Sequence, residues 1–126
     1  MFYVKLRCKN AILRVSDKEV GKNIPENMKL HNSLGIDIGS TTVKIAVLDS
    51  DNHILFADYE RHYANIQETL ALLLSRAKEK LGEMTVRASI TGSGGLTLSR
   101  HLNIPFTQEV VAVATALQAY APQTDV

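Results

Sequence analysis

The chain has 126 residues, of which 45% are hydrophobic and 21% charged, a composition that fits one ordinary globular domain with a modest core. The 14 Lys and Arg residues and 13 Asp and Glu residues give a formal charge of +1, so no strongly basic surface is available to gather nucleic-acid phosphates. The longest aliphatic run, residues 70–74, is far shorter than the roughly 20 apolar residues of a membrane span. Because the N-terminus also lacks a secretory signal, we expect a cytoplasmic protein that binds neither nucleic acid nor a membrane.

Residues 1–33 differ in composition from the rest of the chain, being polar and rich in Lys and Asn. Apolar residues alternate with polar ones over residues 2–8, and more follow at 12–15, which would suit a short pair of strands. The alternative, which we favour, is a divergent leader that is disordered or translated from an upstream start, because Met28 lies just before the first strong element. We therefore expect one structured lobe over residues 34–126.

Three strands in a row are predicted at the start of this lobe. An apolar run over residues 34–38 leads into the small polar turn Gly39-Ser40-Thr41-Thr42, and β-branched and aliphatic residues resume over 43–48. Residues 49–52 have the composition of a second turn, and residues 54–59 supply a third strand. The pattern predicts an antiparallel arrangement whose first hairpin has a tip of small, hydroxyl-bearing residues.

A helix and a fourth strand follow. Apolar residues at helical spacing predict a helix over residues 66–81, with Asn65 as its cap and Glu68 as the capping-box partner. Gly82 stands where a C-terminal cap belongs. Residues 86–90 then read as the fourth strand.

The remainder of the lobe continues the alternation of strands and helices. The glycine-rich residues 91–95 allow either a tight turn or a close approach of the backbone to a ligand. A short helix over 96–102, a brief fifth strand over 104–106 and a helix over 109–120 complete the pattern. The predicted order is β-β-β-α-β-α-β-α, an α/β lobe with a mixed sheet of about five strands.

The first hairpin contains the residues best suited to chemistry. Asp37 ends a buried strand and is followed by Gly39, by three hydroxyl residues and by Lys44. Glycine lets the backbone approach phosphate oxygens, hydroxyl and N–H groups donate hydrogen bonds to them, and one carboxylate is enough to hold a hydrated Mg²⁺. The alternative is a plain turn in which Asp37 caps a backbone group and Lys44 is solvated.

The pattern Asp37-x-Gly39-x-Thr41-x-x-Lys44 resembles the first phosphate motif of the superfamily that contains actin, the seventy-kilodalton heat-shock chaperones and the sugar kinases. Within that superfamily, residues 34–44 are most similar to the ATPases that activate 2-hydroxyacyl-CoA dehydratases and benzoyl-CoA reductases. Thr91-Gly92-Ser93-Gly94 is similar to the turn that follows the fourth strand in those activators. The resemblance covers about residues 28–126.

The resemblance implies a ribonuclease-H-like lobe of an actin-like ATPase. The family's activators are homodimers that bind ATP between two lobes of each subunit, and ATP hydrolysis drives a low-potential electron into the partner dehydratase or reductase. By the resemblance, Asp37 would hold Mg²⁺ through water and Lys44 would neutralise phosphate charge. The phosphates of ATP or ADP would be cradled by Gly39, Ser40, Thr41 and Thr42 and faced by Thr91, Gly92, Ser93 and Gly94.

Two departures from the family limit what the resemblance implies. The family's activators carry a [4Fe-4S] cluster held by cysteines of both subunits, but the corresponding position here is Ala112, and the chain's single cysteine, Cys8, lies in the leader. We therefore expect no cluster in this chain. The family's second phosphate motif and adenine pocket would both follow Val126, so we expect a fragment that needs a second lobe and alone neither binds ATP tightly nor hydrolyses it.

Glu109 is the one further candidate for catalysis. In related kinases an acid at a comparable place lies beside the reacting γ phosphate and can orient a nucleophile. The alternative, which we favour, is an acid that stabilises a helix N-terminus through the helix dipole. The remaining titratable candidates are histidines without metal-ligand spacing, expected on the surface: His31, His53, His62 and His101.

Two other functions remain open beside the activator. A kinase acting on a sugar or small metabolite would use the same phosphate motif, with Glu109 or a neighbour as its base. An actin-like module would bind ATP to control its conformation and turn over no small substrate. The residues around Thr41 to Lys44 favour the activator.

Overall fold

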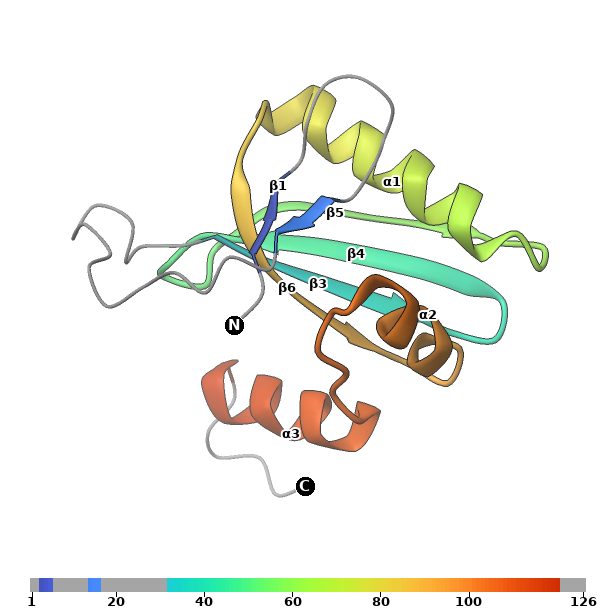
Figure 1. Cartoon of the computed structure of the whole chain (residues 1–126). Coiled ribbons are helices and arrows are strands. Elements are labelled where there is room, and N and C mark those ends of the chain that lie inside the picture. The colour runs from blue at the N-terminus through green and yellow to red at the C-terminus, as the bar shows by residue number, and fades with distance from the viewer. Residues whose placement is uncertain (1–2, 6–13, 17–31, 121–126) are drawn as a thin grey trace.

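The computed structural model describes residues 3–5, 14–16 and 32–120 of the chain. Its strands form one six-stranded sheet with the order β2-β1-β6-β3-β4-β5, and three helices accompany it (Figure 1). The elements are β1 (Tyr3–Lys5), β2 (Arg14–Ser16), β3 (Asn32–Ile38), β4 (Thr42–Leu48), β5 (Ile54–Arg61), α1 (Ile66–Leu81), β6 (Thr85–Thr91), α2 (Gly95–Leu102) and α3 (Glu109–Tyr120).

The sheet is mixed, as predicted. β3, β4 and β5 pair antiparallel in chain order, and the β3–β4 register sets Asp37 opposite Lys44. β6 returns after α1 and pairs parallel with β3, with Asp37 beside Thr91. Since both parallel strands end at the same edge, their carboxyl ends and the β3–β4 hairpin lie together.

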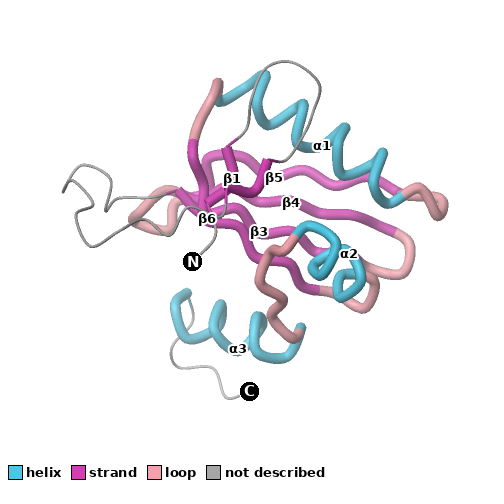
Figure 2. Tube along the Cα trace, in the orientation of Figure 1, coloured by secondary structure: helices cyan, strands magenta, loops and turns pink. Residues whose placement is uncertain are grey.

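One face of the sheet carries the hydrophobic core. Alternate residues of the strands point to opposite faces, and the fully buried set in β3 is Leu34, Ile36 and Ile38. α1 lies along this face (Figure 2) and buries Leu73 and Leu74 against it. Side chains of α2 and of the segment after it join the same core.

The opposite face is lined by small and polar residues. Gly35 and Asp37 of β3 and Ser89 and Thr91 of β6 lie at the register positions between the buried ones. Figure 1 shows α3 on this side of the sheet, across from α1. The sheet therefore separates an apolar core from a face that is available to polar chemistry.

The predicted fifth strand over residues 104–106 is not confirmed. The structure has only an isolated parallel bridge between Phe106 and Ile90, made by Ile90 N–H donating to the Pro105 carbonyl and Thr107 N–H to the Ile90 carbonyl. Pro105 has no N–H to donate, so the ladder cannot extend through it. Four strands, β3 to β6, therefore form from residues 32–120.

The ends of α1 confirm one prediction and correct another. Gly82 ends the helix with φ +77° and donates its N–H to the Lys78 carbonyl, as expected of a glycine cap. Asn65 precedes the helix, but its side chain makes no capping hydrogen bond, so the predicted capping box with Glu68 is wrong. The Thr69 hydroxyl instead donates to the Asn65 carbonyl at 2.8 Å.

Within residues 1–33, the structure describes two short strands, β1 and β2, and the start of β3. β1 pairs antiparallel with β2 and with β6, at the edge of the sheet away from β5. The expectations for Cys8 and Met28 lie outside the described residues, as does everything after residue 120. Over the part of the chain that is described, no helix has the length and apolar character needed to cross a membrane.

Leu73 provides a test of the core. Leu73 is 0% exposed, in the core between α1 and the sheet, whereas its neighbour Leu72 is 45% exposed. Leu73→Ala should lower the free energy of unfolding by about 3 kcal/mol through lost burial and the cavity left behind. Leu72→Ala should cost less than about 1 kcal/mol. Urea unfolding followed by circular dichroism measures both, and equal costs would contradict the assigned faces of α1.

Candidate functional site

The tip of the β3–β4 hairpin is a compact turn with exposed hydroxyl groups. The Gly39 N–H donates to the Thr42 carbonyl at 2.9 Å and closes the turn. Ser40 and Thr41 are exposed and Thr42 is half-buried. The structure thus brings the predicted phosphate-binding residues of this turn to one end of the sheet.

Asp37 and Lys44 lie side by side at the base of this hairpin. They are cross-strand partners, and Lys44 Nζ lies 3.9 Å from Asp37 Oδ2. The Lys44 side chain is 59% exposed and that of Asp37 34% exposed, so this ion pair is partly solvated and contributes little to stability. The structure therefore places the predicted magnesium-binding carboxylate and phosphate-neutralising cation side by side.

Two buried polar atoms at this edge have no partner. Asp37 Oδ1 and Thr91 Oγ1 are both inaccessible to solvent and make no hydrogen bond, and their residues are neighbours across β3 and β6. Buried polar groups are almost always paired, because an unpaired one costs about 1 to 3 kcal/mol. Such a pair of unsatisfied atoms marks a place where the chain tolerates a cost in stability, as functional sites do.

The glycine-rich turn after β6 packs directly on the end of β3. Gly92 has φ +95°, and a Cβ there would lie 2.3 Å from the Ile38 carbonyl oxygen and 2.5 Å from Asp37 Oδ1. Gly94 donates its N–H to the Ile38 carbonyl at 2.9 Å. Glycine is thus required for this close approach, and it brings the predicted turn from Thr91 to Gly94 against Asp37.

A cavity of about 990 Å³ lies along the face of the sheet opposite α1. Asp37, Lys44 and Thr91 contribute polar groups to it, and the rest of its lining is largely apolar and includes Leu48 and Tyr59. α3 closes its other side with Ala112, Thr115 and Ala116. Crevices outside the carboxyl ends of parallel strands are where α/β sheets bind ligands.

Glu109 is not brought into this group. It is exposed at the first residue of α3 and is not among the residues that line the cavity. Ala112, which does line it, offers no ligand for a metal. Cys8 is the chain's single cysteine, so the described residues provide no thiolate for an iron–sulfur cluster.

His62 is a site residue that the sequence pattern does not reveal. A histidine without metal-ligand spacing is expected on the surface, but His62 is only 8% exposed. Its Nε2 lies 3.1 Å from the Gly39 carbonyl oxygen, and its backbone N–H donates to the Thr41 carbonyl at 3.0 Å. Both partners are backbone atoms of the hairpin tip, so no spacing of side chains could reveal the contact.

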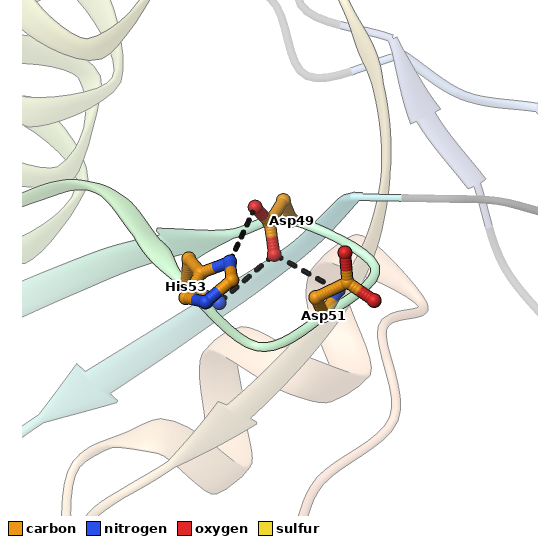
Figure 3. A group of neighbouring side chains, drawn as sticks. All are labelled: Asp49, Asp51 and His53. Atoms are coloured by element: carbon orange, nitrogen blue, oxygen red, sulfur yellow. Dashed lines mark hydrogen bonds and ion pairs between the residues drawn. The ribbon is translucent and has the colours of Figure 1, made fainter.

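A second polar cluster lies at the other end of β4, in the turn before β5 (Figure 3). The His53 N–H donates to Asp49 Oδ1 at 2.8 Å, and the Asp51 N–H donates to the same oxygen at 2.9 Å. The His53 N–H contributes most to lowering the pKa of the Asp49 carboxyl below its usual value. Ligand atoms of Asp49, Asp51 and His53 lie within 4.8 Å of one another, but the turn itself accounts for that arrangement. This cluster is the predicted second turn.

Comparison with solved structures confirms the predicted resemblance at the level of the fold. The chain is similar to component A of the (R)-2-hydroxyglutaryl-CoA dehydratase of Acidaminococcus fermentans, with a TM-score of 0.58 and 20% identity over 75% of this chain. It is also similar to the activator of the 2-hydroxyisocaproyl-CoA dehydratase of Clostridium difficile with bound ADPNP, with a TM-score of 0.52 and 19% identity over 74% of this chain. The chain spans 37% of the length of the first protein and 35% of the second. No protein-family model and no curated protein matches the sequence.

Gly92 provides a test of the packing at this edge. Gly92→Ala should lower the free energy of unfolding by at least about 2 kcal/mol, because its Cβ would meet backbone atoms and its φ is positive. Gly35→Ala is the matched control, since a Cβ there meets nothing within 4 Å. It should be neutral or stabilise by up to about 1 kcal/mol. Thermal and urea unfolding measure the change in unfolding free energy for both variants. No change for Gly92→Ala would show that the turn does not pack against the end of β3.

Proposed function

We propose that this chain is the nucleotide-binding lobe of an ATPase that activates an acyl-CoA dehydratase or reductase by ATP-driven electron transfer. The observation that carries the proposal is the pair of buried, unsatisfied atoms, Asp37 Oδ1 and Thr91 Oγ1, beside a hairpin with exposed hydroxyl groups. The fold shared with two dehydratase activators, one of them solved with bound ADPNP, supports it.

The residues present fit a nucleotide with a hydrated magnesium ion. Asp37 has one buried oxygen, Oδ1, and a second oxygen, Oδ2, that lies 3.9 Å from Lys44 Nζ. A single carboxylate oxygen is enough for Mg²⁺, because this ion keeps most of its water and takes few protein ligands. When bound, the ion offsets phosphate charge and bridges phosphate oxygens. In this proposal Asp37 holds the ion through water and Lys44 attracts the phosphates.

The exposed hydroxyls of the hairpin provide the phosphate contacts in this proposal. Ser40 and Thr41 donate hydrogen bonds to phosphate oxygens, which are strong acceptors because they are charged. The turn from Thr91 to Gly94 closes the site from the side of β6, with its backbone against Ile38. Movement of this turn is thereby coupled to the end of β3 that carries Asp37.

The electron transfer itself belongs to a larger assembly. The activators that share this fold are more than twice as long as this chain, and we propose that a second lobe supplies the remaining phosphate and adenine contacts. The assembly would work as a homo-oligomer in the cytoplasm, with a dehydratase or reductase as its partner. With Ala112 and no described thiolate, this lobe contributes nucleotide binding and the motion it drives, and not a cluster ligand.

The isolated chain should bind Mg-ATP weakly and hydrolyse none. Loss of a few charge-assisted hydrogen bonds, at about 1.5 to 3 kcal/mol each, moves a micromolar dissociation constant towards millimolar. Calorimetric titration of the chain and of its Asp37→Asn variant with Mg-ATP measures the two dissociation constants. We expect weak binding that Asp37→Asn abolishes when Mg²⁺ is present. Low-micromolar binding by the chain, or equal binding by the variant, would contradict the proposal.

A further inference from the structure

We propose that His62 is a positioning residue that holds the hairpin tip in the orientation needed to receive nucleotide phosphates. The inference rests on the proposed function, because it assigns a task to the hairpin of residues 39–42. It extends that function to a residue that none of the phosphate motifs includes.

The ring nitrogens of His62 have distinct roles. Nδ1 lies 3.0 Å from the Ala64 backbone nitrogen and accepts its N–H. In a neutral ring the proton then resides on Nε2, which donates to the Gly39 carbonyl at 3.1 Å. The ring therefore accepts a hydrogen bond from the Ala64 backbone and donates one to the Gly39 backbone.

The backbone of His62 reinforces these hydrogen bonds. Its N–H donates to the Thr41 carbonyl at 3.0 Å, and its carbonyl accepts the Asn65 N–H at 2.6 Å. One residue thus connects both sides of the hairpin tip to the start of α1. With the side chain 8% exposed, water does not compete well for these bonds.

The chain adopts an unfavourable backbone to make this arrangement. Tyr63 and Ala64 follow with φ of 44° and 67°, a region that residues with a Cβ rarely adopt, and two such residues in succession are rarer still. This conformation brings the Ala64 N–H to His62 Nδ1. Strained backbone of this kind clusters at functional sites, where the surrounding structure holds it.

The direction of the Gly39 carbonyl determines what the hairpin presents to a ligand. Along β5, Asp58 and Glu60 both accept hydrogen bonds from Arg76 of α1, so His62, at the next position of the same alternation, lies on the α1 side of the sheet. The Gly39 carbonyl is therefore drawn towards α1. In a trans peptide the following N–H points the opposite way, so the Ser40 N–H is turned towards the face that carries Asp37 and Lys44.

Two substitutions at His62 separate its two hydrogen bonds. In His62→Gln the side-chain nitrogen can occupy the position of Nε2 and donate to Gly39, whereas in His62→Asn the shorter side chain can replace only the acceptor at Nδ1. Thr69→Val is the matched control, because it removes the hydroxyl bond at the start of the same helix without touching the hairpin. Mg-ATP binding is followed by amide shifts of the labelled full chain, which report weak affinities, and thermal unfolding is recorded in parallel.

We expect His62→Asn to weaken Mg-ATP binding roughly tenfold, the effect of one lost hydrogen bond that fixes a phosphate ligand. His62→Gln should restore binding to within about twofold of the original. Thr69→Val should lower the melting temperature and leave the affinity within about twofold. Equal binding by His62→Asn and the original chain, or equal weakening by Asn and Gln, would overturn the inference.

A measurement without nucleotide distinguishes this inference from the proposed function. Nitrogen shifts of the imidazole in the original chain should show a neutral ring protonated at Nε2, and the Gly39 carbonyl shift should change in His62→Asn but not in His62→Gln. A ring protonated at Nδ1 would overturn the inference independently of nucleotide binding. This measurement uses the original chain, so it does not depend on the folding of any variant. If these shifts are as expected but the original chain shows no response to Mg-ATP at residues 39–42, the proposed function fails and the positioning role fails with it.

Discussion

The parallel pairing of β3 with β6 is the constraint on which the rest of this site depends. It sets Asp37 beside Thr91 and ends both strands at one edge, so the turn after β6 must pack on the end of β3. The close approach of Gly92 to the Ile38 carbonyl and the hydrogen bond from Gly94 follow from it. Because one face of both strands is committed to the core beneath α1, the register cannot slip without exposing Ile36 and Ile38.

The same constraint explains why polar groups at this edge are left unsatisfied. The Asp37 carboxylate is pressed between Gly92 and the sheet, so Oδ1 is buried while Oδ2 faces Lys44. A site that holds an anion or a hydrated cation needs such groups to be in place before the ligand arrives. His62 contacts the hairpin tip from the other side, so the elements on both sides of Asp37 are hydrogen-bonded to neighbouring parts of the lobe. In the proposed function the nucleotide then binds at an edge of the sheet whose polar groups are already held in position.

The sequence predicted the parts of this molecule that repeat a pattern. Runs of apolar and β-branched residues on either side of a small polar turn located β3 and β4, and helical spacing located α1 at its observed bounds. The residues of the phosphate motif were found because their types are informative at fixed spacing. The fifth strand failed because Pro105 interrupts a ladder that tertiary contacts reduce to one bridge. His62 was not predicted because its ring contacts the Gly39 carbonyl, 23 residues earlier in the chain, and only folding brings the two together. The unsatisfied atoms of Asp37 and Thr91 likewise become neighbours only in the folded chain.

The central claim, that this edge of the sheet binds a metal–nucleotide complex, is tested most directly with Mn²⁺ in place of Mg²⁺. Bound Mn-ATP broadens the amide signals of residues near the metal, with ATP in excess so that little free ion remains. We predict selective broadening at Gly39 to Thr42 and at Gly92 to Gly94, with the turn from Asp49 to His53, at the far end of β4, unaffected. Broadening centred on that far turn, or none at the hairpin at saturating Mn-ATP, would contradict the account.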